Sequence, residues 1–205
     1  MNLNLITNYF HPNTILDIGA NTGGWFNECK AYYPGSYIFS IEANDECEQV
    51  LKQVNPNYLI CLLAKDNNIY PFYKTKNIFG ATGNSMYKEL TPYYNEENVN
   101  VVEQQGRRLD DLFTEESTFD LIKMDVQGAE LDIIEGGINL CKKAKGILLE
   151  VALDNYNENA PLYDTVVNYM KLIGFELKEV LDNTYHQEKI FQQDLLFINE
   201  NIIRN

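Results

Sequence analysis

The sequence predicts a doubly wound α/β domain, in which a seven-stranded, mostly parallel sheet with one reversed strand carries helices on both faces. Three observations support this prediction. Short apolar runs alternate with amphipathic segments, a glycine-rich turn follows the first run, and two neighbouring apolar runs come last. Alternating strands and helices imply right-handed crossovers, so helices should cover both faces of the sheet.

Local patterns place the first strands and helices. Strands are expected at 15–18, 37–42 and 58–63, where apolar residues are continuous. Between the first two, a helix at about 25–33 should end at the Pro-Gly pair that follows it. Asn44 should cap the next helix, because apolar residues then recur at i, i+3, i+4 and i+7.

The second half of the sequence resumes this alternation after an irregular stretch. We interpret residues 65–108 as an insertion on the acceptor side of a single domain that spans residues 1–205. The insertion carries possible strands near 69–73 and 99–102. The elements expected after it are a strand at 120–125, a long helix at about 129–143, a strand at 146–151, a helix between Pro161 and Gly174, and an antiparallel pair made by FELKEVLD and DLLFINE.

Composition limits the classes of partner. The formal net charge is −14, which disfavours nucleic acid because such binding relies on Lys and Arg neutralising phosphates. The four cysteines lie far apart, without the spacing of a zinc site, so we expect no metal and a reduced, cytoplasmic setting. No signal peptide or apolar run of membrane-spanning length is present, so we expect no membrane partner.

The stretch ILDIGANTGGWF at 15–26 reads as a strand, a tight loop and the start of a helix. It does not match the dinucleotide fingerprint, because Asn21 stands where the second glycine is required, and no P-loop lysine follows. Asp17 also argues against a phosphate ligand, since a carboxylate would repel it from the helix N-terminus. S-adenosylmethionine, which carries a sulfonium and an ammonium but no phosphate, suits this loop.

Glu42 supports the same cofactor. It ends the second strand in IEAN, where an acid accepts hydrogen bonds from ribose hydroxyls in doubly wound sheets. The alternative is that Asp17 only caps a helix, the glycines only turn and Glu42 is a solvated strand end, which requires several coincidences in one loop. A nicotinamide-dependent oxidoreductase is a further alternative. We therefore predict S-adenosylmethionine as the cofactor.

Five segments share a broader pattern: ILDIGANTGGWF, IEAN, RLDDL, DLIKMDVQGAELDIIEGG and DLLFIN. Together they resemble the FkbM family of S-adenosylmethionine-dependent methyltransferases, over about residues 13–151 and again near 194. The resemblance implies the class I methyltransferase fold and methyl transfer to a hydroxyl, commonly on a sugar or a natural-product scaffold. The cofactor-binding residues that it implies are Asp17, Gly19, Asn21 and Gly23 on the methionine side, Glu42 at the ribose, Ala43 and Ala64 at the adenine, and Asp125 facing the reaction zone.

Transfer to a hydroxyl benefits from a base within hydrogen-bond reach. Asp125, Glu150 and His186 are the candidate catalytic residues, because the carboxyl ends of the strands and the last turn meet at the ligand edge of such a sheet. Burial of either acid would raise its pKa toward a useful range. The alternatives are that Asp125 only orients the cofactor amine, that Glu150 only braces the next loop, and that His186 is a solvated loop residue.

The acceptor pocket should lie between loops at about 80–94, 153–160 and the turn near His186. The side chains available there for stacking on a sugar or bonding its hydroxyls are Tyr87, Tyr93, Tyr94, Tyr156, Tyr185, Asn84 and Asn155. Asp154 and Asn155 also offer oxygen ligands to Mg²⁺, a metal-dependent alternative. We predict an O-methyltransferase acting on a glycan or another small hydroxylated acceptor; the alternatives are a non-catalytic cofactor-binding module and transfer to a nitrogen acceptor.

Overall fold

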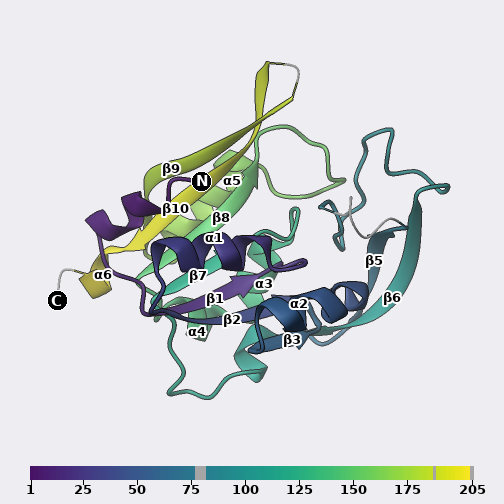
Figure 1. Ribbon diagram of the computed structural model, residues 1–205. Coiled ribbons are helices and arrows are strands. Elements are labelled where there is room, and N and C mark those ends of the chain that lie inside the picture. The colour runs from purple at the N-terminus through teal and green to yellow at the C-terminus, as the bar shows by residue number, and fades with distance from the viewer. Residues whose placement is uncertain (77–81, 187, 204–205) are drawn as a thin grey trace.

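The computed structural model describes residues 1–76, 82–186 and 188–203, and it confirms the class I arrangement (Figure 1). Seven strands form the main sheet in the order β3-β2-β1-β7-β8-β10-β9. All pair in parallel except β10, which runs antiparallel to both of its neighbours. The strands are β1 (Thr14–Ile18), β2 (Tyr37–Glu42), β3 (Tyr58–Ile60), β7 (Leu121–Met124), β8 (Gly146–Ala152), β9 (Phe175–His186) and β10 (Lys189–Asn199).

Helices cover both faces of this sheet. In Figure 1, α1 lies in front of the strands and α5 behind them. The first layer contains η1 (Leu3–Asn8) and α1 (Gly24–Tyr32), and the second contains α3 (Glu130–Gly136), α4 (Ile138–Cys141) and α5 (Tyr163–Leu172). The remaining short elements are η2 (Asp45–Cys47), α2 (Glu48–Val54), η4 (Leu109–Asp111) and α6 (Glu200–Ile203). Asn44 caps η2 as expected, since its side chain accepts a hydrogen bond from the Glu46 amide.

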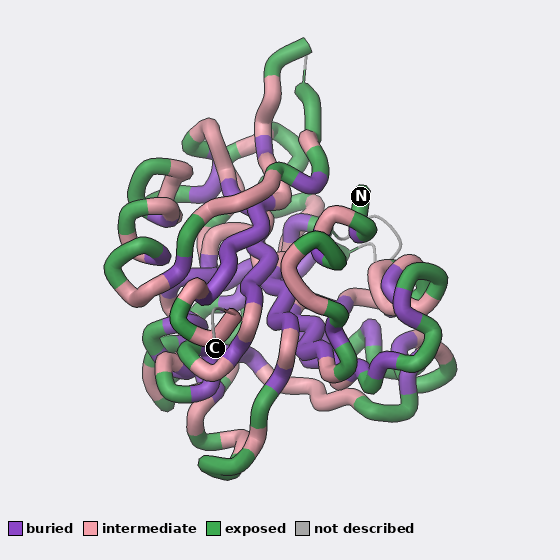
Figure 2. The backbone as a smooth tube through the Cα atoms, turned by 90° about the vertical axis from the view of Figure 1, so that its left-hand side faces the viewer, coloured by how far each residue is buried: buried purple, intermediate pink, exposed green. Residues whose placement is uncertain are grey.

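The strands place their side chains alternately in two apolar cores. In β1, Ile15 packs in the core under α1, whereas Leu16 and Ile18 pack in the core under α3 to α5. The same alternation in β7 assigns Leu121 to the α1 side and Ile122 to the other. Figure 2 shows the buried residues gathered in these central strands. Every second residue, including Asp17 in β1, therefore lies on the α1 side.

The predicted third strand at 58–63 is wrong in one respect, because it divides between two sheets. β3 pairs with β2, but β4 (Leu62–Leu63) leaves the main sheet and pairs with β6 (Val99–Arg107). A second sheet of order β4-β6-β5 results, with β5 (Ile69–Thr75) at its far edge. The insertion thus extends the wall that begins at the end of β3, and Figure 1 shows it beside the carboxyl ends of the main strands.

The predicted long helix at about 129–143 is also wrong, because it is interrupted at Gly136 and Gly137. A Cβ on Gly136 would lie 2.2 Å from the backbone oxygen of Ala64, and one on Gly137 would lie 2.7 Å from Leu109. Gly136 lets α3 approach the backbone of Ala64, just after β4, and Gly137 lets the start of α4 pack against Leu109 in η4. The two glycines also lower the helix propensity at this point.

None of the helices that the described residues form has the length and apolar character needed to cross a membrane.

The close approach at Gly136 leads to a stability prediction. Gly136→Ala should lower the free energy of unfolding by about 1–3 kcal/mol or more, because the added methyl overlaps backbone rather than a flexible side chain. Gly35→Ala is the matched control, since a Cβ there meets no atom within 4 Å, and its effect should stay within about 0.5 kcal/mol. Urea unfolding measures both, and equal values for the two variants would contradict the close approach.

Candidate active site

The glycine loop after β1 is held between the ends of β2 and β7. The amides of Gly19 and Ala20 both donate to the Ile41 carbonyl, at 2.9 and 3.1 Å. Gly19 adopts a φ of 79°, and a Cβ there would lie 1.9 Å from the Asp125 carbonyl oxygen. Only glycine allows this contact. The loop is thereby fixed directly beside the residue that follows β7.

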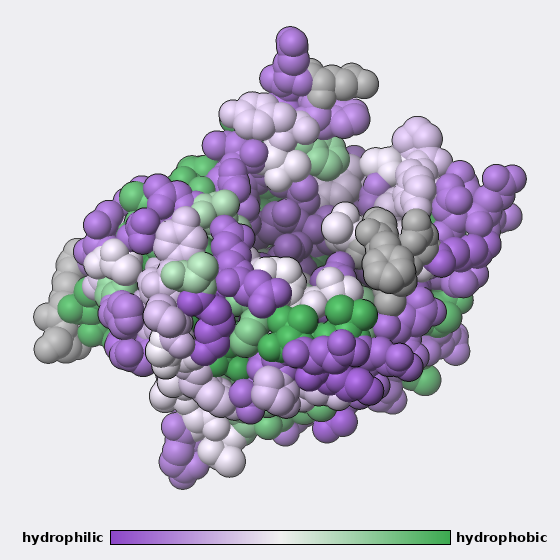
Figure 3. Space-filling model, viewed as in Figure 1, coloured by the Kyte–Doolittle hydropathy of each residue, from purple (hydrophilic) through white to green (hydrophobic). Residues whose placement is uncertain are grey.

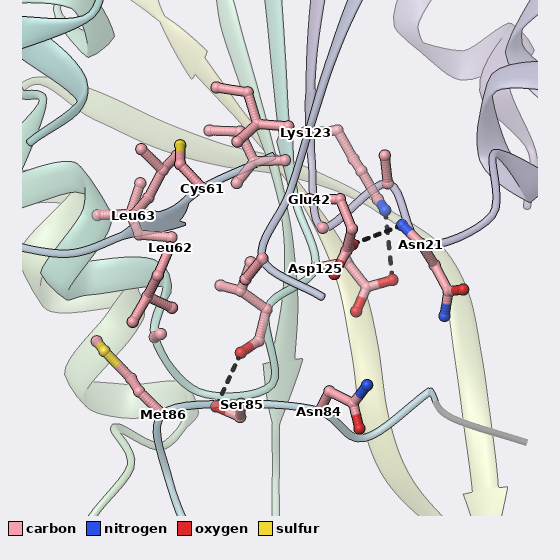
Figure 4. A pocket seen from close by; sticks show the side chains of 18 of the residues that line it. Asn21, Glu42, Cys61, Leu62, Leu63, Asn84, Ser85, Met86, Lys123 and Asp125 are labelled. Carbon is pink, nitrogen blue, oxygen red and sulfur yellow. Dashed lines mark hydrogen bonds and ion pairs between the residues drawn. The ribbon is translucent and has the colours of Figure 1, made fainter. Parts of the chain in front are cut away.

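A cavity of about 380 Å³, the first cavity, opens above this loop at the carboxyl ends of β1, β2 and β7. Figure 4 shows that its walls differ in chemistry. One side presents the apolar or weakly polar side chains of Cys61, Leu62, Leu63 and Met86, and the other presents Asn21, Glu42, Lys123 and Asp125. Its volume lies within the range of about 300–1,000 Å³ that small-molecule sites occupy.

Glu42 ends β2 with a fixed, buried carboxylate. One of its oxygens accepts from the Asn21 amide and the other from the Asn44 amide, both at 2.7 Å. Burial raises the pKa of Glu42, and these backbone hydrogen bonds counter part of that rise. Each carboxylate oxygen can accept more than one hydrogen bond, so Glu42 can still receive hydroxyl groups of a ligand.

Asp17 does not line the cavity; it lies beneath it, with no exposed surface. The Lys123 ammonium is 3.6 Å from Asp17 Oδ1 and 3.3 Å from Asp125 Oδ2, and the Ser40 hydroxyl donates to Asp17 Oδ2 at 3.5 Å. Strand register explains the arrangement, since Asp17 pairs directly with Ser40 on one side and with Lys123 on the other. The counter-charge of Asp17 is therefore a lysine of the protein. We call Asp17, Lys123 and Asp125 the buried ion cluster.

Burial and mutual attraction shift the pKa values of the three groups in the buried ion cluster. Burial alone would lower the pKa of Lys123, but attraction to Asp125 and Asp17 outweighs it and raises that pKa. Burial also acts on Asp125, yet Lys123 holds the pKa of this carboxyl below its ordinary value. At Asp17 burial dominates, and its pKa is raised. The Lys123 ammonium also lies 5.5 Å from the centre of the Trp25 ring, which is a favourable position for a cation.

Asp125 and Glu150 form a pair of carboxyl groups whose pKa values are shifted in opposite directions. Gln127 Nε2 bridges them, donating to Asp125 Oδ1 at 2.9 Å and also to Glu150 Oε2. Gln192 Nε2 donates to the same Glu150 oxygen at 2.8 Å. Burial, together with the nearby charge of Asp125, raises the pKa of Glu150 well above its ordinary value. Of the two carboxyl groups, Glu150 is therefore the one that binds a proton more readily.

The loop after β7 is shaped to place Gln127. Gln127 and Gly128 adopt φ values of 56° and 101°, and the buried Glu130 carboxylate accepts from the amides of Val126 and Gly128 at 3.1 and 3.3 Å. The Gln127 carbonyl accepts from Asn157 Nδ2 at 2.6 Å. The side chains of Glu130 and Asn157 thus fix the backbone of the loop that carries the bridging glutamine.

A second cavity of about 250 Å³ adjoins the first, and Thr82 lines both. Its other lining residues are Gly83, Glu89, Tyr93, Tyr94, Gln127, Tyr156, Phe191 and Gln192. The Tyr156 hydroxyl donates to Gln127 Oε1 at 2.9 Å, and its ring lies 4.4 Å from that of Phe191. Figure 3 shows this face of the molecule hollowed, with hydrophilic side chains around the hollow.

The residues predicted to hold a cofactor divide into two groups. Those that line the first cavity are Gly19, Asn21, Glu42, Ala43 and Asp125. Asp17, Gly23 and Ala64 do not. Gly23 is a packing position, because a Cβ there would lie 2.8 Å from Val54, and Ala64 is buried against Met86 and Ala129.

The candidate catalytic residues are also placed differently from one another. Asp125 lines the first cavity, whereas Glu150 lies behind Gln127 and Gln192, which line the second. His186 ends β9 and is exposed; its ring lies 5.9 Å from that of Phe191, and it lines neither cavity.

The predicted acceptor residues are only partly brought together. Tyr93, Tyr94 and Tyr156 line the second cavity, and Asn84 lines the first. Tyr87 instead donates to Asp132 at 2.6 Å, while Tyr185 and Asn155 are exposed and line neither cavity. Gly80, at the start of the expected loop, lies outside the described residues.

Lys123, Gln127 and Gln192 were not identified from the sequence. A signal for Lys123 existed, because alternation in LIKMD places it on the same face as Asp125. Asp154, considered for Mg²⁺, forms an ion pair with Lys189 at 2.8 Å. Within the described ranges, no group of three or more His, Cys, Asp or Glu side chains is arranged to hold a metal ion.

Comparison by sequence finds one family. The profile described as "Methyltransferase FkbM domain" matches residues 17–177, most of the chain. None of the curated proteins compared with the chain matches it.

Comparison by structure finds the same fold in distant proteins. Methyltransferase FkbM from Methylobacillus flagellatus KT is similar over 91% of this chain, with 16% identity and a TM-score of 0.55; the chain spans only 43% of that protein. Magnesium protoporphyrin IX methyltransferase from Synechocystis PCC 6803, with bound SAM, is similar over 96% of this chain and 74% of its own, with 12% identity and a TM-score of 0.52. TrmK from M. capricolum, with S-adenosyl-homocysteine, is similar over 92% and 62%, with 11% identity and a TM-score of 0.51.

The buried ion cluster leads to a second stability prediction. Lys123→Met should lower the free energy of unfolding by about 3–5 kcal/mol, because it leaves the buried Asp17 and the half-buried Asp125 without their counter-charge. The control is Lys189→Met, which removes an exposed ion pair and should cost no more than about 1 kcal/mol. Chemical denaturation compares the two, and a loss below about 1 kcal/mol for Lys123→Met would show that the cluster is not stabilising.

Proposed function

Because the chain belongs to the FkbM family of methyltransferases, we propose that it transfers a methyl group from S-adenosylmethionine to a hydroxyl group of a sugar or another small hydroxylated acceptor. The observation that carries the proposal is the hydrogen bond from Gln127, which lines the second cavity, to Asp125, which lines the first. A ligand in each cavity would meet the other beside a carboxylate, which is where a hydroxyl proton must be received.

The first cavity fits S-adenosylmethionine in shape and chemistry. Glu42 would hold the ribose hydroxyls, the glycine loop would approach the methionine portion, and the apolar side with Leu62, Leu63 and Met86 would pack on the adenine. The Synechocystis and M. capricolum methyltransferases are described with SAM and with its product, S-adenosyl-homocysteine, which agrees with this assignment.

Charge supports a cationic cofactor over a phosphorylated one. Glu42 and Asp125 face the cavity and Asp17 lies beneath it, against the single ammonium of Lys123. At about 4 Å and an effective dielectric constant of about 20, two like charges repel by roughly 4 kcal/mol, so a pyrophosphate would be strongly disfavoured here. When bound, S-adenosylmethionine supplies an electrophilic methyl group on a sulfonium.

The side chains of the protein position the acceptor and receive its proton. The second cavity offers aromatic rings for the faces of a sugar and polar groups for its hydroxyls. Methyl transfer would replace the carbon–sulfur bond of the methyl group by a bond to the acceptor oxygen, and the O–H bond of that oxygen would break as its proton passes to the Asp125–Glu150 pair. Asp125 is the ionised member and lines the first cavity, so it receives the proton. Alignment of the acceptor oxygen with the methyl carbon and the sulfur would supply much of the remaining rate acceleration.

His186 has no part in this proposal, because it lines neither cavity.

Cofactor binding provides the first test. Calorimetry should show binding of S-adenosylmethionine and no comparable binding of NAD. Glu42→Gln should weaken S-adenosylmethionine binding about tenfold, because it removes the charge from the acceptor of the ribose hydroxyls. Glu48→Gln, an exposed acid on α2, is the matched control and should leave affinity unchanged. Tighter binding of NAD would refute the cofactor assignment.

The pH dependence of turnover provides the second test. Because its pKa is raised, Glu150 holds its proton to a higher pH than an ordinary glutamate, and loss of this proton would make the neighbouring Asp125 a stronger base. The rate of methyl transfer should therefore rise as the pH increases through the raised pKa. Glu150→Gln should abolish this rise while keeping cofactor affinity, whereas Glu158→Gln, an exposed acid, should retain it. A rise of the same size in Glu150→Gln would exclude the pair as the proton acceptor.

The acceptor itself requires a screen. Mass spectrometry of a panel of monosaccharides and glycans should detect products that gain one methyl on oxygen. Methylation confined to nitrogen would favour an N-methyltransferase. No transfer to any hydroxylated acceptor, with cofactor binding intact, would favour a non-catalytic binding module.

A further inference from the structure

We infer that the second cavity accepts a single uncharged sugar unit and rejects one that carries a carboxylate or a phosphate. This inference rests on the proposed function, because it names the class of acceptor that the same site would take. It follows from the direction of the amide groups, the distribution of charge and the size of the cavity.

The amide N–H groups at the back of the cavity are directed to the acid pair. Gln127 Nε2 donates to Asp125 and Glu150, and Gln192 Nε2 donates to Glu150 and to the Tyr156 hydroxyl. An anionic group on an acceptor could only accept hydrogen bonds, so it would compete with these carboxyl groups for the same donors. A hydroxyl can donate as well as accept, and this wall therefore suits hydroxyl groups.

The charged groups around the second cavity are negative. Glu89 lines it, and ionised Asp125 lies directly behind Gln127. Among the described lining residues there is no Lys or Arg, and residues 77–81, NIFGA, carry no charge in the sequence. Lys189, on the adjacent hairpin, forms an ion pair with Asp154 at 2.8 Å. Sites that bind carboxylates or phosphates supply an arginine or lysine for them, and this one supplies a glutamate.

Glu89 is built into the wall. A Cβ on Gly83 would lie 2.2 Å from the Tyr94 hydroxyl and 2.5 Å from Glu89 Oε2, so the glycine allows both groups to converge on the cavity. Thr91 donates to the other carboxyl oxygen of Glu89, and Glu89 pairs with Asn157 in an antiparallel bridge. The backbone and the side chain of Glu89 are thus held from separate segments.

The size and the aromatic rings favour one sugar ring. The volume of about 250 Å³ falls below the range of about 300–1,000 Å³ typical of drug-sized ligands. The rings of Tyr156 and Phe191 pack in a tilted arrangement with their centroids 4.4 Å apart. The rings of Tyr93 and Tyr94 meet edge to face with their centroids 5.6 Å apart. Aromatic rings bind the C–H faces of a neutral sugar without requiring a charge.

Paired acceptors test the inference. Methyl transfer is measured for methyl glycosides and for the matching methyl glycuronosides, which differ only by a carboxylate in place of the hydroxymethyl group. The neutral member should have a kcat/KM at least about tenfold higher. Saturation-transfer NMR with S-adenosyl-homocysteine present measures binding of the same pairs without turnover, and it should show the neutral member alone in the site.

Variants identify the group responsible. Glu89→Gln should reduce the preference for the neutral acceptor about three- to tenfold, by removing the charge and keeping the shape of the side chain. Glu158→Gln, an equal change of charge on an exposed residue of the neighbouring loop, should leave the preference unchanged.

The possible outcomes separate this inference from the proposed function. Equal or faster transfer to the glycuronosides would overturn the inference and leave sugar O-methylation standing. Binding of neutral glycosides without any transfer would support the inference and contradict the proposed chemistry. If no glycoside of either kind binds or reacts, the inference fails, and the proposed function then requires a hydroxylated acceptor that is not a sugar.

Discussion

The arrangement of the site depends on one buried ammonium group, that of Lys123, held between Asp17 and Asp125. Charges of this kind are costly to bury, and they persist in proteins when their partners are close and fixed. Direct pairing of β1 with β7 places Asp17 beside Lys123, so strand register alone brings these two groups together. Lys123 lowers the pKa of Asp125, whereas burial and the charge of Asp125 raise the pKa of Glu150, so two chemically similar groups differ in how readily they bind a proton.

Gln127 connects these two acids to the second cavity, because it binds both of them and lines that cavity. Its N–H groups are committed to the two acids, and its oxygen accepts from Tyr156. The positive φ values of Gln127 and Gly128 direct the side chain to that place, and the Glu130 carboxylate stabilises the loop through two backbone amides. Gln127 thus links the polar lining of the second cavity to the charged groups at the end of β7.

The fold, and the lining of the first cavity by five of the eight predicted cofactor residues, follow from local patterns, because alternation, glycine spacing and capping are properties of short segments. Asn44 and the glycine loop are examples. The pairing of Asp17 with Lys123 depends on strand register, which two separate segments decide together. The break at Gly136 depends on the approach of Ala64, and the position of Glu150 behind two glutamines depends on the β10 neighbour. Such features require the assembled chain, so periodicity alone did not predict them.

The two cavities draw on different parts of the chain. The first is built mainly from the ends of β1, β2 and β7 with residues 82 and 84–86, whereas the second is built from the stretch at 82–94, Gln127 after β7, the loop after β8 and the β10 strand. Substitutions in the loop after β8 or in β10 can therefore alter the second cavity without touching the lining of the first. If the second cavity holds the acceptor as proposed, exchange of these two segments between relatives would change the acceptor and leave the first cavity intact.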